Sequence, residues 1–354
     1  MKKIINRKIS KIKKITLEAT TKLPVYVIAD MACAHEGNYD SARHFIDIAT
    51  KAKADAIQFQ IFYPDEYIHP KDSDYKFVKK IALSPKQWMK LFKHAHKNNL
   101  EVISVAGDRK SIDLAESQDT DGYKVHSADL NNPYITKYIA KLDKPITLSI
   151  GGSYWDEIKN GIKDIQDCGN HNIILMYGMQ NFPTPLESVN LNSILEIERK
   201  LKLPIGYQDH TDGESAWSFW LPIITLGVGV KVLEKHITYD RKKKGIDYQA
   251  ALNPDEFCEF VKAVRTAEVI LSDPGKGAFY DLNDKAKEYR AYAKMRKVVT
   301  NRAIKKGEPL KEDDLKVIRF RNGKISAGDF SSIIGRKASR DLPHLYPLDW
   351  EDLD

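Results

Sequence analysis

Short β-branched apolar runs alternate with longer amphipathic segments over most of this chain. Runs of four or five residues between polar or turn-forming residues are typical of buried parallel strands. The longer segments between them are typical of the helices that cover such strands. Between Pro24 and about Leu271 the runs are Val25–Ala29, Ala56–Phe59, Glu101–Val105, Gly122–Val125, Ile146–Ser149, Ile173–Met176, Pro204–Tyr207 and Val230–Leu233.

The intervening segments carry helix signals. In Tyr39–Ala52 the apolar side chains recur at i, i+3, i+4 and i+7, which predicts a helix with one buried face. Ser84-Pro85 predicts the start of another helix, with Ser84 as N-cap. The most apolar stretch, Trp217 to Leu233, predicts a buried helix leading into a strand. Eight strand–helix units over about 250 residues predict a (β/α)8 TIM barrel. The alternative is an open doubly wound sheet, but no GxGxxG follows any run.

The length of 354 residues predicts more than one domain. Residues 1–23 are predicted as a basic, solvated N-terminal arm and residues 24–271 as the barrel domain. Residues 272–295 are polar and rich in Lys, Asp and Tyr, which is typical of a linker. Residues 296–354 are predicted as a small separate domain of short strands and turns.

Composition and charge exclude several function classes. Hydrophobic residues make up 42% and charged residues 30% of the chain, and no apolar run is long enough to span a membrane. Residues 1–14 contain seven basic residues and no acidic ones, so the remainder of the chain is close to neutral despite the formal charge of +7. We therefore expect no nucleic-acid partner, and the N-terminus lacks the apolar core of a secretory signal. The three cysteines show no CxxC spacing, and a cytoplasmic location is the default expectation.

Two histidines follow the last two apolar runs. His210 lies in Asp209-His210-Thr211, and His236 lies in Glu234-Lys235-His236. A single His after a strand more often forms a local hydrogen bond than binds a ligand. Two neutral imidazoles from neighbouring strands can instead share one divalent metal ion, and the carboxylates beside both histidines favour this interpretation.

Other polar side chains end the remaining strands. Because the C-terminal ends of barrel strands meet at one face, we expect these side chains to form one site. A fixed lysine with nearby hydroxyls and glycine amides is suited to an anionic group. Together with a metal, these groups favour carbon–carbon bond chemistry on a phosphorylated or acidic small molecule. The clusters contain Asp30, Gln58, Gln60, Lys124, Ser127, Asp129, Ser149, Gln180 and Phe182.

The ordered motifs resemble the sialic acid synthase family, which includes the N-acetylneuraminate, legionaminate and pseudaminate synthases. The segment from about Met295 resembles the antifreeze-like (SAF) domain that ends these enzymes. The motifs are Ala34-His35-Glu36-Gly37, Gln58-Phe59-Gln60, Tyr123-Lys124-Val125-His126-Ser127, Phe182-Pro183-Thr184-Pro185, Gly206-Tyr207-Gln208-Asp209-His210-Thr211 and Glu234-Lys235-His236-Ile237-Thr238.

This resemblance implies a specific reaction. The family condenses phosphoenolpyruvate with an N-acylated hexosamine aldehyde, giving a nine-carbon 2-keto sugar acid and phosphate, in surface-glycan biosynthesis. It uses a divalent metal, Mn²⁺ or Mg²⁺, and forms a domain-swapped homodimer. We therefore expect small-molecule substrates and a second copy of the chain as partners.

The resemblance also implies residue roles. His210 and His236 are expected to bind the metal. The other expected residues are, as catalytic acids or bases, Asp30, Asp129, Glu234 and Asp247, and, as substrate-binding groups, Gln58, Gln60, Lys124, Ser127, Ser149, Gln180, Phe182 and, from the SAF domain, Arg319.

Several residues depart from the family pattern on the donor side. Gln58 stands where the family usually has a lysine for the donor phosphate, and Gln208 stands where a serine is common. Either other cations such as Arg109 or Lys110 compensate, or the donor is not phosphoenolpyruvate. A metal-dependent aldolase or lyase and a non-catalytic sugar-binding relative therefore remain as alternatives to a synthase.

Overall fold

The computed structural model describes residues 10–17, 24–271, 284–293 and 295–354. It divides into two compact units, one within residues 1–272 and the other within residues 273–354. Each unit has a hydrophobic core of its own. No helix in the described ranges is both long and apolar enough to cross a membrane.

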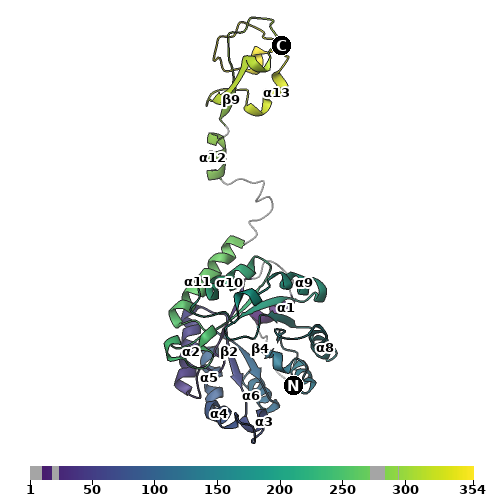
Figure 1. The fold of residues 1–354 in the computed structure, drawn as a ribbon, viewed down its shortest axis with the longest axis vertical. Coiled ribbons are helices and arrows are strands. Elements are labelled where there is room, and N and C mark those ends of the chain that lie inside the picture. The colour runs from purple at the N-terminus through teal and green to yellow at the C-terminus, as the bar shows by residue number, and fades with distance from the viewer. Residues whose placement is uncertain (1–9, 18–23, 272–283, 294) are drawn as a thin grey trace, which may run out of the picture. The chain divides into compact units, whose positions relative to one another are not determined.

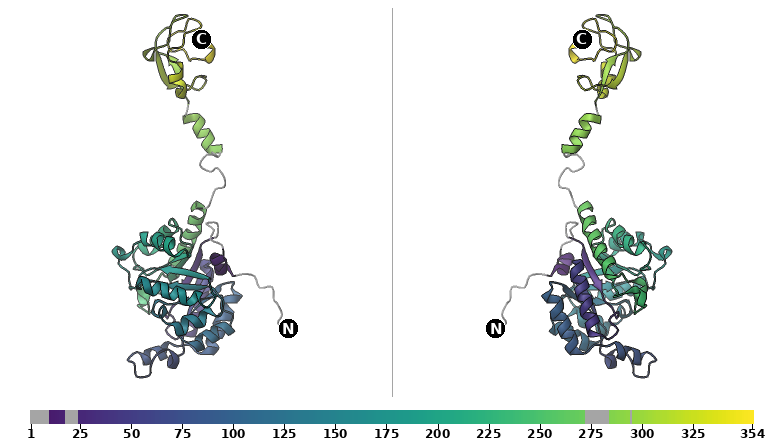
Figure 2. Two further views of the ribbon diagram at one scale, coloured as in Figure 1. Left: turned by 90° about the vertical axis from the view of Figure 1, so that its right-hand side faces the viewer. Right: turned by 90° about the vertical axis from the view of Figure 1, so that its left-hand side faces the viewer.

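The first unit is a closed barrel of eight parallel strands, in which β8 pairs with β1. The predicted TIM barrel is therefore confirmed, and the open sheet is excluded. Figures 1 and 2 show helices packed around the outside of the strands. The strands are β1 Tyr26–Asp30, β2 Ala56–Ile61, β3 Glu101–Ala106, β4 Gly122–Val125, β5 Ile146–Ser149, β6 Ile173–Tyr177, β7 Ile205–Asp209 and β8 Val232–His236.

The helices begin where the sequence signals them. Helix α2 covers the predicted residues, with Asn38 as its N-cap, and Ser84 forms a capping box with Gln87 at the start of α5. The helices of this unit are α1 Lys11–Leu17, α2 Tyr39–Ala52, α3 Pro64–Tyr67, α4 Tyr75–Ile81, α5 Pro85–Lys97, α6 Arg109–Ser117, α7 Pro133–Ala140, α8 Trp155–Gln166, α9 Asn192–Leu201, α10 Trp217–Leu226 and α11 Pro254–Leu271.

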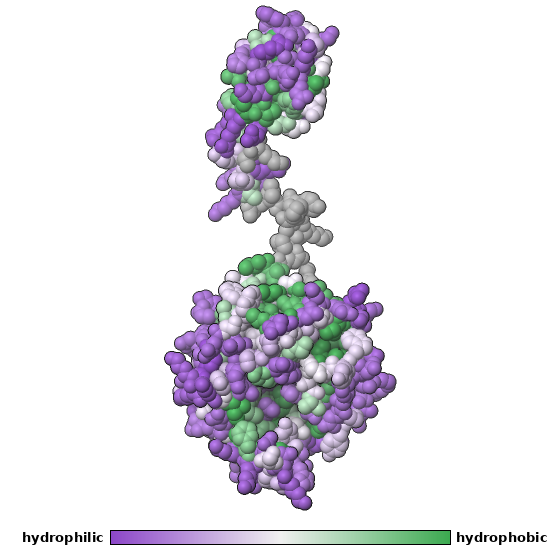
Figure 3. Space-filling view, in the orientation of Figure 1, coloured by the Kyte–Doolittle hydropathy of each residue, from purple (hydrophilic) through white to green (hydrophobic). Residues whose placement is uncertain are grey.

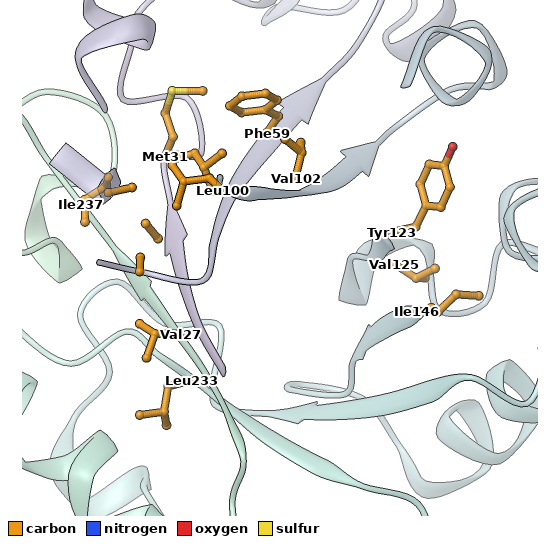
Figure 4. Close-up of a cluster of buried hydrophobic side chains, with 14 of the residues drawn as sticks. Val27, Met31, Phe59, Leu100, Val102, Tyr123, Val125, Ile146, Leu233 and Ile237 are labelled. Carbon is orange, nitrogen blue, oxygen red and sulfur yellow. The ribbon is translucent and has the colours of Figure 1, made fainter. Parts of the chain in front are cut away.

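The largest core lies between the strands and the helices. Figure 4 shows Val27 of β1 and Leu233 of β8 side by side in this layer, and the two residues are partners in the parallel register. The same register places Asp30, the last residue of β1, beside His236 of β8 and Gln58 of β2. Packing on the outside of the barrel thus fixes which polar side chains meet at its C-terminal end.

The prediction of a solvated N-terminal arm is wrong for residues 10–17, which include helix α1. Ile12 and Ile15 are buried against the first residues of several strands, including Tyr26, Ala56 and Val232. The backbone amide of Lys11 donates to Glu101. Two isoleucines three positions apart form an apolar stripe that closes the N-terminal end of the barrel. The rest of the predicted arm, residues 1–9 and 18–23, lies outside the described residues.

The helix predicted between Trp217 and the last strand is present as α10, but it is only partly buried. Trp217, Trp220 and Ile224 lie on one face with 46%, 53% and 47% of their surfaces exposed. Helix α11 ends in the exposed residues Val269, Ile270 and Leu271. Figure 3 shows hydrophobic surface over this part of the barrel unit.

The second unit begins, within the described residues, with helix α12 Asp284–Ala293. Strands β9 Arg296–Thr300 and β10 Leu315–Arg319 form an antiparallel pair, and α13 Phe330–Ile333 is a single turn. Val298, Ile304, Leu310 and others form its core. Part of the predicted linker is therefore helical. Residues 272–283 and 294 of that linker lie outside the described residues.

We predict that α1 stabilises the barrel. Ile12→Ala should lower the free energy of unfolding by about 2–5 kcal/mol, because a fully buried isoleucine is truncated. Leu17→Ala is the matched control, since this residue of the same helix is 57% exposed, and it should change stability by less than about 0.5 kcal/mol. Urea titrations followed by circular dichroism measure both, and equal losses would show that α1 does not dock.

Candidate active site

A cavity of about 210 Å³ lies at the C-terminal end of the barrel, and we call it the barrel-mouth cavity. This is the face where TIM-barrel enzymes carry their active sites. Its walls come from strand ends and the loops that follow them. The lining residues are Asp30, Ala32, Gln58, Gln60, Val105, Lys124, His126, Gln180, Phe182, His210, His236 and Asp247.

Lys124 forms an ion pair with Glu234 across the barrel, from β4 to β8. Both side chains are buried, with 4% and 1% of their surfaces exposed. Burial raises the pKa of Glu234 to about 7, although the Lys124 ammonium opposes this shift. The second carboxyl oxygen of Glu234, Oε2, has no hydrogen-bond partner within the described ranges. Glu234 can therefore exchange a proton near neutral pH.

Asp30 provides a second buried carboxyl group beside this pair. Its Oδ1 accepts a hydrogen bond from the backbone amide of Ala32 at 2.8 Å. Its Oδ2 lies 3.7 Å from Nε2 of His236. Burial raises the pKa of Asp30, and the charge of Lys124 partly offsets that effect.

The two predicted metal-binding histidines lie together. Their ring centroids are 5.2 Å apart, and the Phe182 ring contacts both. Nδ1 of His210 donates to the carbonyl of Met179 at 2.7 Å, which leaves Nε2 as a lone-pair donor in the neutral ring. Burial lowers the pKa of His236 to about 3 and the pKa of His210 well below its usual value. Both rings are therefore neutral at pH 7.

This spacing fits one shared ion. Two imidazoles that bind one metal at about 2.0–2.1 Å in tetrahedral geometry have ring centroids about 5 Å apart. Within the described ranges, however, no group of three or more His, Cys, Asp or Glu side chains has the arrangement of a metal site. A metal here would thus depend on the two imidazoles, with water or substrate in its remaining positions.

Asp247 reaches the cavity from the loop after β8. It has a left-handed backbone, with φ of 61°, and the amide of the preceding Ile246 donates to Oε1 of Glu36 at 3.2 Å. Burial raises the pKa of Asp247 to about 6, and the nearby Asp30 adds to this shift. The loop is held so that a carboxyl group faces the cavity.

Four predicted residues of the barrel unit, Glu234, Ser127, Asp129 and Ser149, are not among the residues that line the cavity. The hydroxyl of Ser149 donates to the side-chain carbonyl of Gln208 at 2.9 Å, so it is engaged inside the barrel. Asp129 accepts a hydrogen bond from the Asn132 amide, and Ser127 begins the same short turn. The predicted phosphate clamp of Lys124, Ser127 and Ser149 therefore has only Lys124 at the cavity wall.

Arg319 belongs to the second unit, where its guanidinium lies over the Tyr292 ring at 4.0 Å.

The two cations that were suggested to compensate for Gln58 at the donor site are engaged elsewhere. Arg109 stacks on Tyr134, and Lys110 pairs with Glu66. Neither is among the residues that line the cavity.

Sequence reasoning missed three lining residues, Ala32, Val105 and His126. The two apolar residues carry no chemical signal in the sequence. His126 was detectable, because it lies two positions after Lys124 and directly before Ser127. Burial, together with the charge of Lys124, lowers its pKa to about 4.

Models of two known protein families match the chain. A model of the NeuB family matches residues 45–276, and a model of the SAF domain matches residues 296–354. The predicted SAF domain after the barrel is therefore confirmed.

Relatives match over most of the chain. An uncharacterised protein of Methanocaldococcus jannaschii is 32% identical over 93% of this chain and 95% of its own length. Pseudaminic acid synthase of Campylobacter jejuni is 29% identical over 91% of this chain and 94% of its own. The crystal structure of N-acetylneuraminic acid synthetase from Leptospira borgpetersenii, in complex with citrate, covers 75% of this chain and 91% of its own, with 25% identity and a TM-score of 0.67.

The buried ion pair predicts a pH-dependent loss of stability. In Lys124→Met the pKa of Glu234 should rise above its value of about 7, because the opposing cation is gone. The variant then retains a proton that the wild type releases, so its stability relative to wild type should fall as pH rises from 6 to 8. The loss at pH 8 should approach the 3–5 kcal/mol typical of breaking a buried pair.

Lys124→Met/Glu234→Gln is the control for this prediction. With no carboxyl group at position 234, the double variant should lose less stability between pH 6 and pH 8 than wild type or the single variant, because neither state titrates at this position, and part of the loss at pH 8 should be recovered. Urea titrations in chelator-treated buffer measure these free energies. A pH-independent loss in the single variant would contradict the assignment.

Proposed function

The chain belongs to the NeuB family, and we propose that it condenses phosphoenolpyruvate with the open-chain aldehyde of an N-acylated hexosamine. The products would be a nine-carbon 2-keto sugar acid and inorganic phosphate. The observation that carries this proposal is the barrel-mouth cavity, where two neutral imidazoles adjoin Lys124, Asp30 and Asp247. The names of the relatives, which include synthases of pseudaminic and N-acetylneuraminic acid, support the substrate class.

A divalent cation, Mn²⁺ or Mg²⁺, is part of the proposal. His210 and His236 would hold it, because both are neutral and their rings have a suitable separation. A bound divalent ion supplies Lewis acidity that polarises the aldehyde of the sugar.

The side chains around the histidines would bind the anionic groups of the donor and transfer protons. Lys124 lies at the cavity wall, where it can bind an anionic oxygen of the donor. Formation of the new carbon–carbon bond requires a proton at the aldehyde oxygen. Loss of phosphate requires a base for the water that attacks carbon 2 of the donor. Glu234, with a pKa of about 7, is suited to release the proton, and Asp30 or Asp247 to accept one.

A metal-dependent aldolase is the second candidate. Lys124 is the single lysine or arginine among the described residues that line the cavity, and it is already paired with Glu234. This charge distribution suits a donor with one anionic group, such as a 2-oxo acid, as well as it suits a phosphorylated donor. Phosphate release distinguishes the two reactions, because only the condensation of phosphoenolpyruvate produces it.

We also propose that the protein acts as a domain-swapped homodimer in which Arg319 completes the partner's acceptor site. Arg319 is exposed on β10, with its guanidinium held over the Tyr292 ring. The exposed apolar face of α10 and the apolar end of α11 give a second copy a surface to cover.

The reaction test combines phosphoenolpyruvate, Mn²⁺ and a panel of N-acylated hexosamines and measures inorganic phosphate. Release should require all three components, and His210→Ala or His236→Ala should lower turnover by about 10²- to 10³-fold. His171→Ala is the control, because this histidine is exposed and lies away from the cavity.

Gln58→Lys should improve use of phosphoenolpyruvate by adding a cation. In a parallel assay, pyruvate replaces phosphoenolpyruvate. Consumption of pyruvate there, with no phosphate release from phosphoenolpyruvate, would establish the aldolase instead.

The dimer test mixes two inactive variants. An Arg319→Ala protomer contributes an intact barrel, and a His236→Ala protomer contributes an intact Arg319. If Arg319 acts on the partner, statistical mixing should restore roughly a quarter of wild-type activity. If it acts within its own chain, the mixture should stay inactive. A fully active monomer in light scattering would exclude the proposal.

A further inference from the structure

We propose that His126 binds substrate: its Nε2–H group donates a hydrogen bond to an anionic oxygen of the donor in the barrel-mouth cavity. The oxygen belongs to a carboxylate or a phosphate group. The inference rests on the proposed function for the identity of the donor, but it also holds for a 2-oxo acid donor.

The position of His126 places it at the cavity wall. It directly follows β4, two residues after Lys124, and it lines the cavity together with Lys124 and Gln58. Its backbone is extended, with φ of −68° and ψ of 155°, before the chain turns into the short 3₁₀ helix Ser127–Asp129. The ring and the Lys124 ammonium therefore come from one strand end.

A backbone contact fixes the tautomer of the ring. Nδ1 of His126 accepts a hydrogen bond from the backbone amide of Ala128 at 3.2 Å. A neutral imidazole carries one proton, so that proton is on Nε2. The lowered pKa of His126, about 4, keeps the ring neutral at physiological pH. No hydrogen bond to Nε2 is found within the described ranges, so the N–H group is available to a ligand.

Two other groups predicted to bind the donor are already engaged, whereas the Gln180 side-chain nitrogen at the cavity wall also has no partner within the described residues. Lys124 shares its charge with Glu234, and the hydroxyl of Ser149 is bound to Gln208. The nearby Asp30 and Asp247 carboxyl groups repel an anion unless it is hydrogen-bonded or neutralised. A neutral N–H group adds a hydrogen bond to an anionic oxygen, and such bonds are stronger than those between neutral groups.

A purely structural role for His126 would be the N-cap of the 3₁₀ helix, through the same Nδ1 contact. Two substitutions separate the roles. Asn is a favoured N-cap residue whose carbonyl can accept from Ala128, but it has no group at the position of Nε2. Gln places its amide N–H near the position of Nε2, but it is not a favoured N-cap residue.

The experiment is isothermal titration calorimetry on the full chain with Mn²⁺ present and no sugar. The probes are phosphoenolpyruvate, pyruvate and inorganic phosphate. His126→Asn should keep the melting temperature of wild type and raise the Kd of phosphoenolpyruvate by about 10- to 100-fold, because a charge-assisted hydrogen bond is lost. His126→Gln should bind within a few-fold of wild type. His171→Asn controls for the substitution itself, since it alters an exposed histidine.

The three probes identify the recognised group. An effect of His126→Asn on pyruvate but not on phosphate assigns the bond to the carboxylate, and the reverse assigns it to the phosphate. If wild type binds pyruvate but not phosphoenolpyruvate, the proposed condensation fails, and the pyruvate data alone decide the role of His126. Wild-type affinity in His126→Asn, or no binding of any probe to wild type, would overturn the inference.

Discussion

The charge of Lys124 is the interaction on which the rest of the site depends. The ammonium group lies inside the barrel, where low dielectric makes its field strong, and it pairs with Glu234 on the opposite strand. It lowers the pKa of Glu234 and Asp30, and it also lowers the pKa of the three cavity histidines. One buried cation thus keeps the pKa values of the two carboxyl groups lower than burial alone would make them, and it helps to keep the imidazoles neutral. Burial acts on the carboxyl groups in the opposite direction, so their protonation reflects the balance of the two effects.

A second buried ion pair, between Lys235 and Asp209, has a different role. Both side chains are fully buried, and Asp209 also accepts hydrogen bonds from the hydroxyls of Thr211 and Tyr207. None of these residues lines the cavity. The pair joins β7 to β8 directly beside the two histidines, which it helps to hold in place. The motifs Asp209-His210-Thr211 and Glu234-Lys235-His236 therefore each combine structural residues with residues that face the site.

The sequence predicted the barrel well, because strand and helix signals are local. The predicted strand at Gly122–Val125 and the helix at Tyr39–Ala52 have their predicted bounds. Contacts between distant segments were not predictable in the same way. Ser149 is engaged by Gln208, 59 positions along the chain, and α1 has only two apolar residues to signal that it docks. His126 lay inside a recognised motif, but only the fold shows that its ring reaches the cavity.

The histidines show how the backbone can assign different chemistry to identical side chains. All three rings in the cavity are neutral for the same reasons, namely burial and the field of Lys124. Nδ1 of His210 faces a carbonyl oxygen, which can only accept, so its proton is on Nδ1 and Nε2 has a lone pair. Nδ1 of His126 faces an amide N–H, which can only donate, so its proton is on Nε2. The first arrangement suits a metal ion, and the second suits an anionic oxygen. The polarity of one backbone group beside each ring therefore determines whether that histidine presents an acceptor or a donor to the cavity.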